Sequence, residues 1–304
     1  MYPVRWGIPD LRDGATDPYL TNDEDLRAAE RLWNESQRSI FAEALESYYR
    51  TNPRVTAAQA RQFAHGAMAA EWRSQGVLDE CLRDAALAPF SAFADVGCGT
   101  GPLSLAASRA GFDVYGVDIG LRWLVLAAAR AREAGARFTL ACADAARLPF
   151  DDGSMDVVAS EGLLENVPSA GAVVEEAARA LRQRGRFCAV TANRWSVGPD
   201  PHVGLPLGGW LGEGLVKRYA GWRGMVPPRR HLLDTREVRT LLRRTPLVER
   251  RIVPTPVSDA QRAGAPAVVR LGVDAYRVVA RNAAGRAALR AIGPTLLVIA
   301  DRTG

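Results

Sequence analysis

The sequence predicts an α/β protein built around a parallel sheet, and three observations support this fold class. From Phe93 onward, short apolar runs alternate with stretches of helical periodicity. A glycine-rich turn follows the first of these runs, as expected where a strand passes into a helix. Hydrophobic residues make up 48% and charged residues 24% of the 304-residue chain, which are values typical of globular proteins. The alternation therefore indicates βαβ units with right-handed crossovers.

Residues 1–90 are predicted to form an N-terminal helical region. A first helix is expected from Thr21 to about Tyr49, because a capping residue and three acids precede apolar residues at helical spacing. Asn52 and the following proline break this pattern. Thr56 and Gln59 then have the spacing of a capping box, and a second amphipathic stripe continues beyond them.

Residues 91–304 are predicted to form the sheet-containing domain. Its expected strands are the apolar runs at 93–96, 112–117, 137–142, 155–160, 187–192, 248–256 and 294–300. Its expected helices cover 103–111, 121–135, 172–183 and 233–244, the last capped by Asp234 or Thr235. No internal repeat interrupts this order.

The segment 193–232 departs from the alternation and is predicted to be an insertion packed over the active site. It is rich in Gly, Pro and Trp, and four aromatic side chains argue against disorder. These aromatics could wall a pocket for a ring or a lipid, while Arg194, Arg229 and Arg230 could hold an acidic group. Equally, the aromatics could simply hold the insertion onto the sheet.

Several classes of protein are disfavoured by composition. No apolar run reaches the roughly 18 to 20 residues of a membrane span, and the first residues lack the apolar core of a secretory signal, so a cytoplasmic location is expected. The four cysteines are far apart, without a C-x-x-C pair or a histidine cluster. They are expected to be four reduced, mostly buried thiols, with neither a disulfide framework nor a metal site.

The run FADVGCGTGP at 93–102 carries the clearest chemical signal. Its G-x-G-x-G turn differs from the G-x-G-x-x-G of nicotinamide-binding proteins, and Asp95 precedes the first glycine by two residues. A carboxylate there would repel a pyrophosphate but would suit a cation. Asp118, at the end of the second strand, could accept the hydroxyls of a ribose. Together these residues favour a cationic nucleoside without phosphates, and S-adenosylmethionine fits that description.

Three stretches resemble the successive motifs of the class I S-adenosylmethionine-dependent methyltransferases, particularly the branch that acts on small molecules. They are ADVGCGTG with GVD downstream, CADAARLPFDDGSMDVVAS, and RGRFCAVTAN, and the resemblance covers about residues 90–192. It implies a Rossmann-like, seven-stranded, mostly parallel sheet whose last strand is antiparallel. The final hairpin would consist of the strands near 247–254 and 294–300.

The resemblance also implies a cofactor site at the carboxyl ends of the strands. Gly97, Gly99 and Gly101 would line the methionine part of S-adenosylmethionine, with Asp95 near its ammonium group. Glu161, at the end of the fourth strand, belongs to the same expected set. A plainer alternative is that the glycines only make a tight turn between a strand and a helix.

The adenosine part would contact the ends of the second and third strands. Asp118 would hold the ribose, and Ile119 would pack on the adenine. Asp144 would accept a hydrogen bond from the adenine amino group, with Ala145 contributing its backbone. The plainer alternatives are that Asp118 caps a helix and that Asp144 starts a turn.

Methyl transfer to a hydroxyl group requires a base that removes the proton. His202, in PDPHVGL within the insertion, is the preferred candidate, against a structural or substrate-shaping role. Many relatives carry a histidine several residues after the fourth strand, and here Glu165 stands at about that point, which makes it the second candidate. His231 is a weaker candidate, and His65 lies off its helix stripe and is expected to be solvated.

The expected function is O-methylation of a small-molecule acceptor, such as a natural product, a sugar or a lipid-like compound. A nucleic-acid substrate is disfavoured, because Lys217 is the single lysine and no dense basic stripe or N-P-P-Y type motif is present. The alternative is a non-catalytic S-adenosylmethionine-binding protein that regulates a partner. The N-terminal helices could form the contact of a homodimer.

Overall fold

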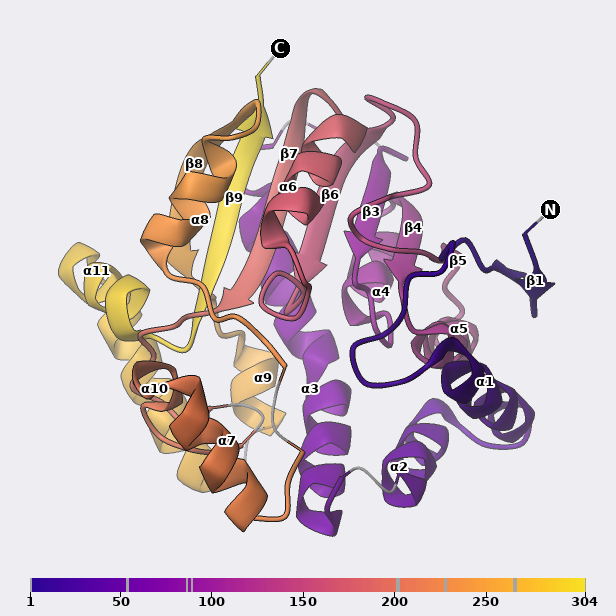
Figure 1. Cartoon of the computed structure of the whole chain (residues 1–304). Coiled ribbons are helices and arrows are strands. Elements are labelled where there is room, and N and C mark those ends of the chain that lie inside the picture. Colours follow the sequence, from indigo (N-terminus) through magenta and orange to yellow (C-terminus); the bar gives the residue numbers. More distant parts are fainter. Residues whose placement is uncertain are drawn as a thin grey trace.

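A computed structural model describes residues 2–52, 55–85, 87–88, 90–200, 203–226, 229–264 and 267–303. Among these residues, seven strands form one sheet in the order β5-β4-β3-β6-β7-β9-β8 (Figure 1). The strands are β3 (Ala92–Val96), β4 (Asp113–Asp118), β5 (Thr139–Cys142), β6 (Met155–Glu161), β7 (Leu181–Ala192), β8 (Leu247–Pro254) and β9 (Thr295–Arg302).

The pairing of these strands confirms the predicted mixed sheet. β5, β4, β3, β6 and β7 are mutually parallel, whereas β9 is antiparallel to both β7 and β8. β3 is the central one of these five parallel strands, with Asp95 opposite Gly116 of β4 and Ala159 of β6. Parallel strands end at a common edge of the sheet, so the carboxyl ends of β3, β4, β5 and β6 are neighbours. That edge is where ligands bind in folds of this kind.

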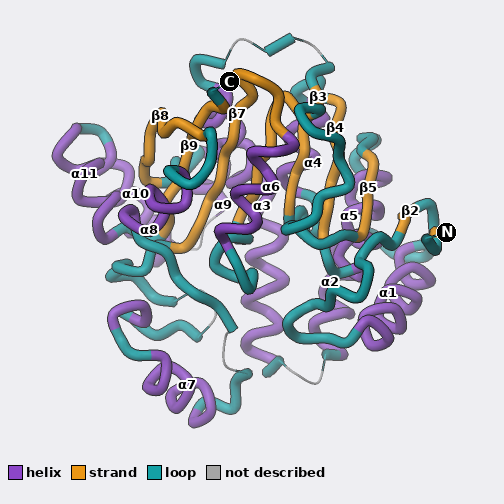
Figure 2. The backbone as a smooth tube through the Cα atoms, turned by 45° about the horizontal axis from the view of Figure 1, so that its top comes forward, coloured by secondary structure: helices purple, strands orange, loops and turns teal. Residues whose placement is uncertain are grey.

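Helices cover both faces of the sheet, as Figures 1 and 2 show. Alternate residues along each strand point to opposite faces. Phe93 packs into a core with α3 (Ala57–Leu82) and α4 (Pro102–Arg109), and the next residue, Ala94, packs into a core with α6 (Ala170–Ala180) and α8 (Thr235–Leu242). Asp234 caps α8, as predicted. The two layers of helices bury strand residues to exposures near zero.

The N-terminal region is helical, but its first predicted helix is two helices. α1 (Asn22–Ser36) ends at a polar turn, and α2 (Phe41–Thr51) begins after Ile40. In that turn the Ser36 and Ser39 hydroxyls donate to carbonyls of the preceding helical turn, which competes with continued helix formation. α3 begins at the predicted capping box of Thr56 and Gln59. A small hairpin of β1 (Val4–Arg5) and β2 (Ile8–Pro9), which the sequence did not suggest, precedes these helices.

The final hairpin contains more than its two predicted strands. β8 and β9 pair antiparallel, as expected, but three helices separate them along the chain. They are α9 (Asp259–Gly264), α10 (Ala267–Ala280) and α11 (Ala283–Ile292). Both Figure 1 and Figure 2 place α10 and α11 beyond the β8 edge of the sheet, opposite the edge at which the N-terminus lies.

The expectation of four reduced cysteines was wrong for two of them. Cys81 of α3 and Cys188 of β7 form a disulfide, with their Cα atoms 6.1 Å apart and a sequence separation of 107 positions. Both are buried, and the fold brings them together because α3 crosses the sheet face to which Cys188 points. Sequence spacing alone gave no sign of this pairing. Cys98 and Cys142 are buried free thiols, as expected.

Between β7 and α8 the chain forms a 3₁₀ turn (Gly208–Trp210) and α7 (Glu213–Trp222). Figure 2 shows α7 standing away from the sheet. The end of this segment returns to the N-terminal region, where the Arg229 amide donates to the Tyr19 hydroxyl at 3.2 Å and its guanidinium donates to the Pro18 carbonyl. Within the described ranges, every helix is too short or too polar to traverse a bilayer.

Candidate functional site

The glycine turn at the end of β3 is built from backbone that other residues adopt poorly. Gly97, Gly99 and Gly101 all have positive φ, at 71°, 53° and 75°. A Cβ on Gly97 would lie 2.8 Å from a methyl carbon of Leu163, so a side chain is excluded there. A Cβ on Gly99 would meet nothing within 4 Å. The turn is therefore packed on one side and open on the other.

Asp95 lies under this turn with only 1% of its surface exposed. The Ser104 hydroxyl donates to its Oδ2 at 2.6 Å. Burial raises the pKa of Asp95 to about 7, the hydrogen bond from Ser104 opposes the rise, and the nearby carboxylate of Glu161 adds to it. No basic side chain among the described residues pairs with Asp95. A bound cation would supply the missing counter-charge.

Glu161, at the end of β6, faces side chains of α3. The Arg73 Nε lies 3.4 Å from its Oε1, and the Ser74 hydroxyl donates to its Oε2. Asp95 and Glu161 line the same cavity of about 490 Å³, here called the α3 cavity. Its lining also includes Tyr49, Gln62, Phe63, Gly66, Ala67, Ala70, Arg73, Gly97, Cys98, Gly99, Thr100, Pro102, Leu103 and Trp123.

Asp118, at the end of β4, closes the opposite side of the turn. Its Oδ2 accepts from the Gly99 amide at 2.9 Å, and its Oδ1 accepts from the Gly120 amide at 2.8 Å. Burial raises the pKa of Asp118 to about 6, although both amide donors favour the ionised form. The amides fix the direction of the carboxylate and leave each oxygen a further lone pair for a ligand hydroxyl.

Asp118 lines a second and larger cavity of about 720 Å³, here called the β4–β5 cavity. Ile119, Asp144 and Ala145 line it as well, and Asp144 Oδ1 accepts from the Ala146 amide at 2.9 Å in the turn after β5. The remaining walls are formed by Gly14, Ala15, Thr16, Asp17, Pro18, Tyr19, Gly97, Gly99, Val117, Arg122, Trp123, Ala143, Gly162, Leu163, Asn166, Val167 and Pro168.

The structure thus places eight of the nine predicted cofactor residues on two cavities that meet at the glycine turn. Gly97, Gly99 and Trp123 line both cavities. Gly101 is the exception. A Cβ on Gly101 would lie 3.1 Å from the Ala127 Cβ of α5 (Leu121–Glu133), so this glycine allows close packing of α4 on α5.

Of the two predicted catalytic residues, only Glu165 can be placed, and it lines neither cavity. His202 lies outside the described residues. Glu165 is buried, and its carboxylate accepts from the Thr191 hydroxyl at 2.9 Å and from the Ala192 amide at 3.1 Å. These contacts tie Glu165 to the end of β7. Its role as a base stays a prediction.

The insertion uses its aromatic side chains to contact its own chain and α8. Trp195 packs edge-to-face on Trp210, with ring centres 5.0 Å apart, and its indole nitrogen donates to Asp234 at 3.1 Å. Arg230 is buried in an ion pair with Asp200. These contacts directly support the alternative that the aromatic side chains hold the insertion in place.

The remaining arginines and histidines named from the sequence lie at the surface. Arg194 stacks over Trp195 and lies 3.6 Å from Glu237, and Arg229 contacts the N-terminal segment as described above. His231 lies 3.2 Å from Glu237. His65 is exposed, as expected. None of these side chains lines the α3 or the β4–β5 cavity.

Sequence reasoning missed an aromatic wall beside the α3 cavity. Tyr49 of α2, Phe63 of α3 and Trp123 of α5 line both that cavity and a neighbouring one of about 250 Å³, here called the aromatic cavity. Tyr48 packs edge-on against Trp123, with ring centres 5.1 Å apart. The periodicity identified Phe63 as part of a helix stripe, but no local signal shows that this stripe faces a cavity.

The N-terminal segment that covers the β4–β5 cavity was missed as well. Asp25 of α1 is fully buried and accepts from Arg12 at 2.9 Å, from Arg122 at 2.6 Å and from the Leu121 amide at 2.8 Å. Arg122 also pairs with Asp17 at 2.9 Å. This network joins the N-terminal segment to the first turn of α5, directly after Ile119.

Comparison with known proteins matches the middle of the chain, which contains the glycine turn, to a known domain family. The family described as "Methyltransferase domain" matches residues 94–189, which include the glycine turn and the ends of β4, β5 and β6. Ubiquinone biosynthesis O-methyltransferase from Idiomarina loihiensis is 38% identical over 101 residues, and that from Cupriavidus pinatubonensis is 36% identical over 104 residues. Each alignment covers 33% of this chain. The chain spans 42% and 41%, respectively, of the lengths of these relatives.

Solved structures extend the similarity to most of the chain at low identity. Phosphoethanolamine N-methyltransferase 2 from Haemonchus contortus has a TM-score of 0.53 at 18% identity, covering 81% of this chain and 58% of its own. Magnesium protoporphyrin IX methyltransferase from Synechocystis has a TM-score of 0.51 at 16% identity, covering 84% and 91%. A [4+2]-cyclase, SpnF, has a TM-score of 0.50 at 18% identity, covering 75% and 80%. At such identities the comparison concerns the fold.

The motifs, the sheet order and these similarities agree with one another. Residues 94–189 match the methyltransferase domain family, and the chain has the Rossmann-like α/β fold of the methyltransferase structures to which it is similar.

Proposed function

We propose that this chain is an S-adenosylmethionine-dependent methyltransferase that methylates an oxygen atom of a small molecule. The observation that carries the proposal is the buried carboxylate of Asp95, which has no cationic partner among the described residues and lies beside an open glycine turn. A pyrophosphate would be repelled there, whereas an ammonium group would be stabilised. The described residues therefore fit S-adenosylmethionine.

In this proposal, the two parts of S-adenosylmethionine bind in the two cavities. The α3 cavity would take the amino-acid part, with Asp95 on the ammonium and Arg73 on the carboxylate. The β4–β5 cavity would take the adenosine, with Asp118 on the ribose, Ile119 against the adenine, and Asp144 and the Ala145 backbone at the adenine edge. Gly97 and Gly99 would lie where the two parts join.

S-adenosylmethionine, when bound, supplies a methyl group already activated by a sulfonium. The protein then has to hold the acceptor oxygen in line with that methyl group and to exclude water. The aromatic cavity is next to the α3 cavity, and the rings of Tyr49, Phe63 and Trp123 offer a flat apolar wall. This supports an acceptor that carries an aromatic ring or a lipid-like chain. The named reaction of the curated relatives, O-methylation in ubiquinone biosynthesis, supports oxygen as the accepting atom.

Removal of the acceptor proton is assigned, within this proposal, to His202 or to Glu165. Glu165 would first have to exchange its hydrogen bonds with Thr191 and Ala192 for one with the acceptor. Replacing His202 by Ala should lower kcat and remove the acidic limb of its pH profile if His202 is the base. Glu165→Gln serves as the parallel variant, because it keeps the size of the side chain and most of its hydrogen bonds.

The domain assignment and the context of the enzyme are part of the same proposal. Residues 1–90 would form a helical region that completes the site, and residues 91–304 the catalytic domain, with the insertion 193–232 over the acceptor. The chain would act in the cytoplasm, as a homodimer through its N-terminal helices, on a small molecule rather than a nucleic acid. The Cys81–Cys188 disulfide is unusual for a reducing compartment. Titration of free thiols immediately after cell lysis would test the location.

The decisive experiment measures binding and turnover separately. Calorimetry with S-adenosylmethionine should show one site, which Asp118→Ala should weaken at least tenfold. Release of S-adenosylhomocysteine is then followed with a panel of phenols, prenylated phenols and sugars. Binding without turnover on any acceptor, together with a captured protein partner, would favour the non-catalytic regulator. The cyclase that shares this fold makes the turnover measurement necessary.

A further inference from the structure

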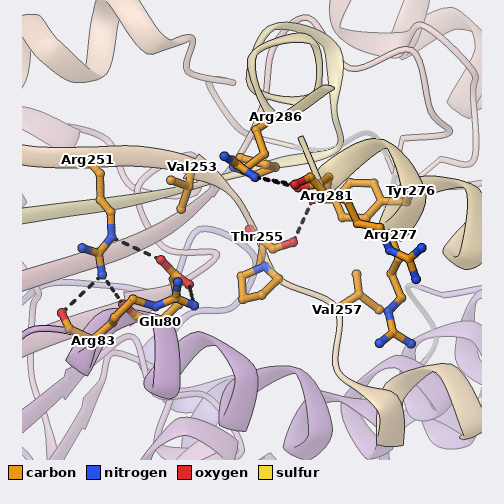
Figure 3. Close-up of a pocket in the computed structure, with 13 residues that line it drawn as sticks. Glu80, Arg83, Arg251, Val253, Thr255, Val257, Tyr276, Arg277, Arg281 and Arg286 are labelled. Carbon is orange, nitrogen blue, oxygen red and sulfur yellow. Dashed lines mark hydrogen bonds and ion pairs between the residues drawn. The ribbon is translucent and has the colours of Figure 1, made fainter. Parts of the chain in front are cut away.

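A separate cavity lies at the β8 edge of the sheet and shares no lining residue with the three cavities described above. It has a volume of about 630 Å³, which is within the range of small-molecule sites. Its walls come from the end of α3, from β8 with the segment after it, and from α10 and the start of α11 (Figure 3). We call it the arginine cavity.

Five arginines and one glutamate supply the charge of this cavity. Glu80 pairs with Arg83 at 2.6 Å and with Arg251 at 3.2 Å, as Figure 3 shows on one side of the cavity. Arg251 also reaches Asp84 at 3.0 Å. The carboxylates near α3 are thus already engaged by arginines of the cavity wall. Little negative charge therefore remains to neutralise the arginines of the opposite wall, which comes from α10 and α11.

The far wall carries the uncompensated charge. Arg277 pairs with Asp259 at 2.6 Å. Arg286 donates from Nη1 to the carbonyls of Ala280 and Arg281, which orients its guanidinium without neutralising it. Among the described residues, the side chain of Arg281 has no ion pair or hydrogen bond. Two cations therefore border the cavity without a carboxylate partner.

The space between the two charged walls is apolar. Val253 and Val257 line it, and the ring of Tyr276 stands beside them in Figure 3. The Tyr276 hydroxyl donates to the Thr255 carbonyl at 2.8 Å, so its polar end is satisfied and its ring faces the cavity as apolar surface. The cavity thus combines a cationic rim with an apolar interior.

We infer that the arginine cavity is a binding site for an amphiphilic oxyanion, a compound with a phosphate or carboxylate group on an apolar body. Arg281 and Arg286 would bind the oxyanion, since guanidinium groups match the geometry of both head groups. Val253, Val257 and Tyr276 would contact the apolar body. This site is independent of the proposed methyl transfer, because no residue of the α3 or β4–β5 cavity takes part.

The experiment uses the full chain and calorimetry with n-octyl phosphate below its micellar concentration. We expect a single site, at least tenfold weaker binding in Arg281→Ala, and stronger loss in Arg281→Glu. Arg270→Ala is the matched control, because Arg270 is exposed on α10, the helix that Arg281 follows, but lies outside the cavity lining. S-adenosylmethionine titration of every variant shows separately whether the fold and the methyl-donor site are intact.

Further probes identify the head group and its source. Octanoate binding with the same Arg281 dependence would support a carboxylate head, and binding of phosphatidylglycerol vesicles with that dependence would support a lipid head group. Equal affinity for n-octanol and octyl phosphate would overturn the inference, because the arginines would then contribute nothing. It would also be overturned if Arg281→Glu and Arg270→Ala bound octyl phosphate alike, or if the wild-type chain bound none of the three anionic probes.

Discussion

The raised pKa of Asp95 makes the binding of a cationic ligand depend on pH in a calculable way. An ammonium group beside Asp95 favours the ionised carboxylate, so the ligand must release the proton that the free protein holds. With a pKa of about 7, the ionised fraction of Asp95 rises from about 3% near pH 5.5 to about 50% near pH 7. Ionisation of Asp95 alone should therefore increase the affinity for S-adenosylmethionine about 15-fold over this range. The α-amino group of the ligand stays protonated there, because it titrates near pH 8.

Ionisation of Asp118 makes a smaller contribution to the pH dependence of the affinity. With a pKa of about 6, its ionised fraction rises from about one quarter to about nine tenths over this range, which adds a factor of about four. Asp95→Asn should lower the affinity and leave only this fourfold slope. Asp113→Asn is the control, because Asp113 is exposed at the other end of β4 and should keep the full slope.

Calorimetry in buffers of different ionisation enthalpy measures both the affinity and the number of protons released. The wild-type chain should release protons near pH 6, and Asp95→Asn should release fewer. In the absence of ligand, the quantity that depends on pH is the stability of the folded chain, and it changes in the opposite direction. The folded chain holds the Asp95 proton up to about pH 7, whereas the unfolded chain loses it near 3.8, so Tm should fall as pH rises through this window. Equal slopes in wild type and Asp95→Asn would refute the assignment.

The remaining predictions concern stability and the glycine turn. Asp25→Ala should destabilise the chain by about 3–5 kcal/mol in urea unfolding, because Arg12 and Arg122 each lose one of their two carboxylate partners at a buried site, whereas Asp23→Ala should change little. Reduction of the disulfide, or Cys188→Ser, should lower stability by about 4–5 kcal/mol, since the closed loop spans 107 residues; unchanged urea midpoints would contradict this. Gly97→Ala should weaken binding of S-adenosylmethionine, because a φ of 71° is unfavourable for alanine and the new Cβ would displace Leu163, and calorimetry beside a Tm measurement separates lost binding from unfolding.

The fold was predictable wherever local periodicity decides structure. The strands around the glycine turn and the capping box at Thr56 follow from residues close in sequence, and both were found as expected. The helices between β8 and β9 were not predicted. α9 packs against α3 and α11 packs against β8, and these contacts join segments far apart in the sequence, so local periodicity does not reveal them. The break after Ser36 depends on competing serine hydrogen bonds that periodicity does not register.

Part of the candidate site was likewise predictable from the sequence, and part was not. Asp95 and Asp118 lie at the carboxyl ends of β3 and β4, and Asp144 follows β5, so parallel pairing alone brings them to one edge of the sheet. Asp17 reaches the β4–β5 cavity only because a buried ion-pair network folds the N-terminal segment onto α5. The spacing of residues along the sequence does not reveal such long-range ion pairs. The disulfide was missed for the same reason, because its two cysteines meet across α3 and the sheet.

The ion pair between Arg122 and Asp17 has a consequence for how long a ligand stays bound. The segment 14–19 forms one wall of the β4–β5 cavity, and this pair, together with Asp25, holds that wall closed. A nucleoside bound there, as proposed above, would contact this wall, so part of the barrier to its dissociation would depend on the ion pair. Weakening the pair should therefore shorten the residence time of the reaction product more than it lowers equilibrium affinity. The far N-terminus would then set the pace of turnover at a site formed mainly by the middle of the chain.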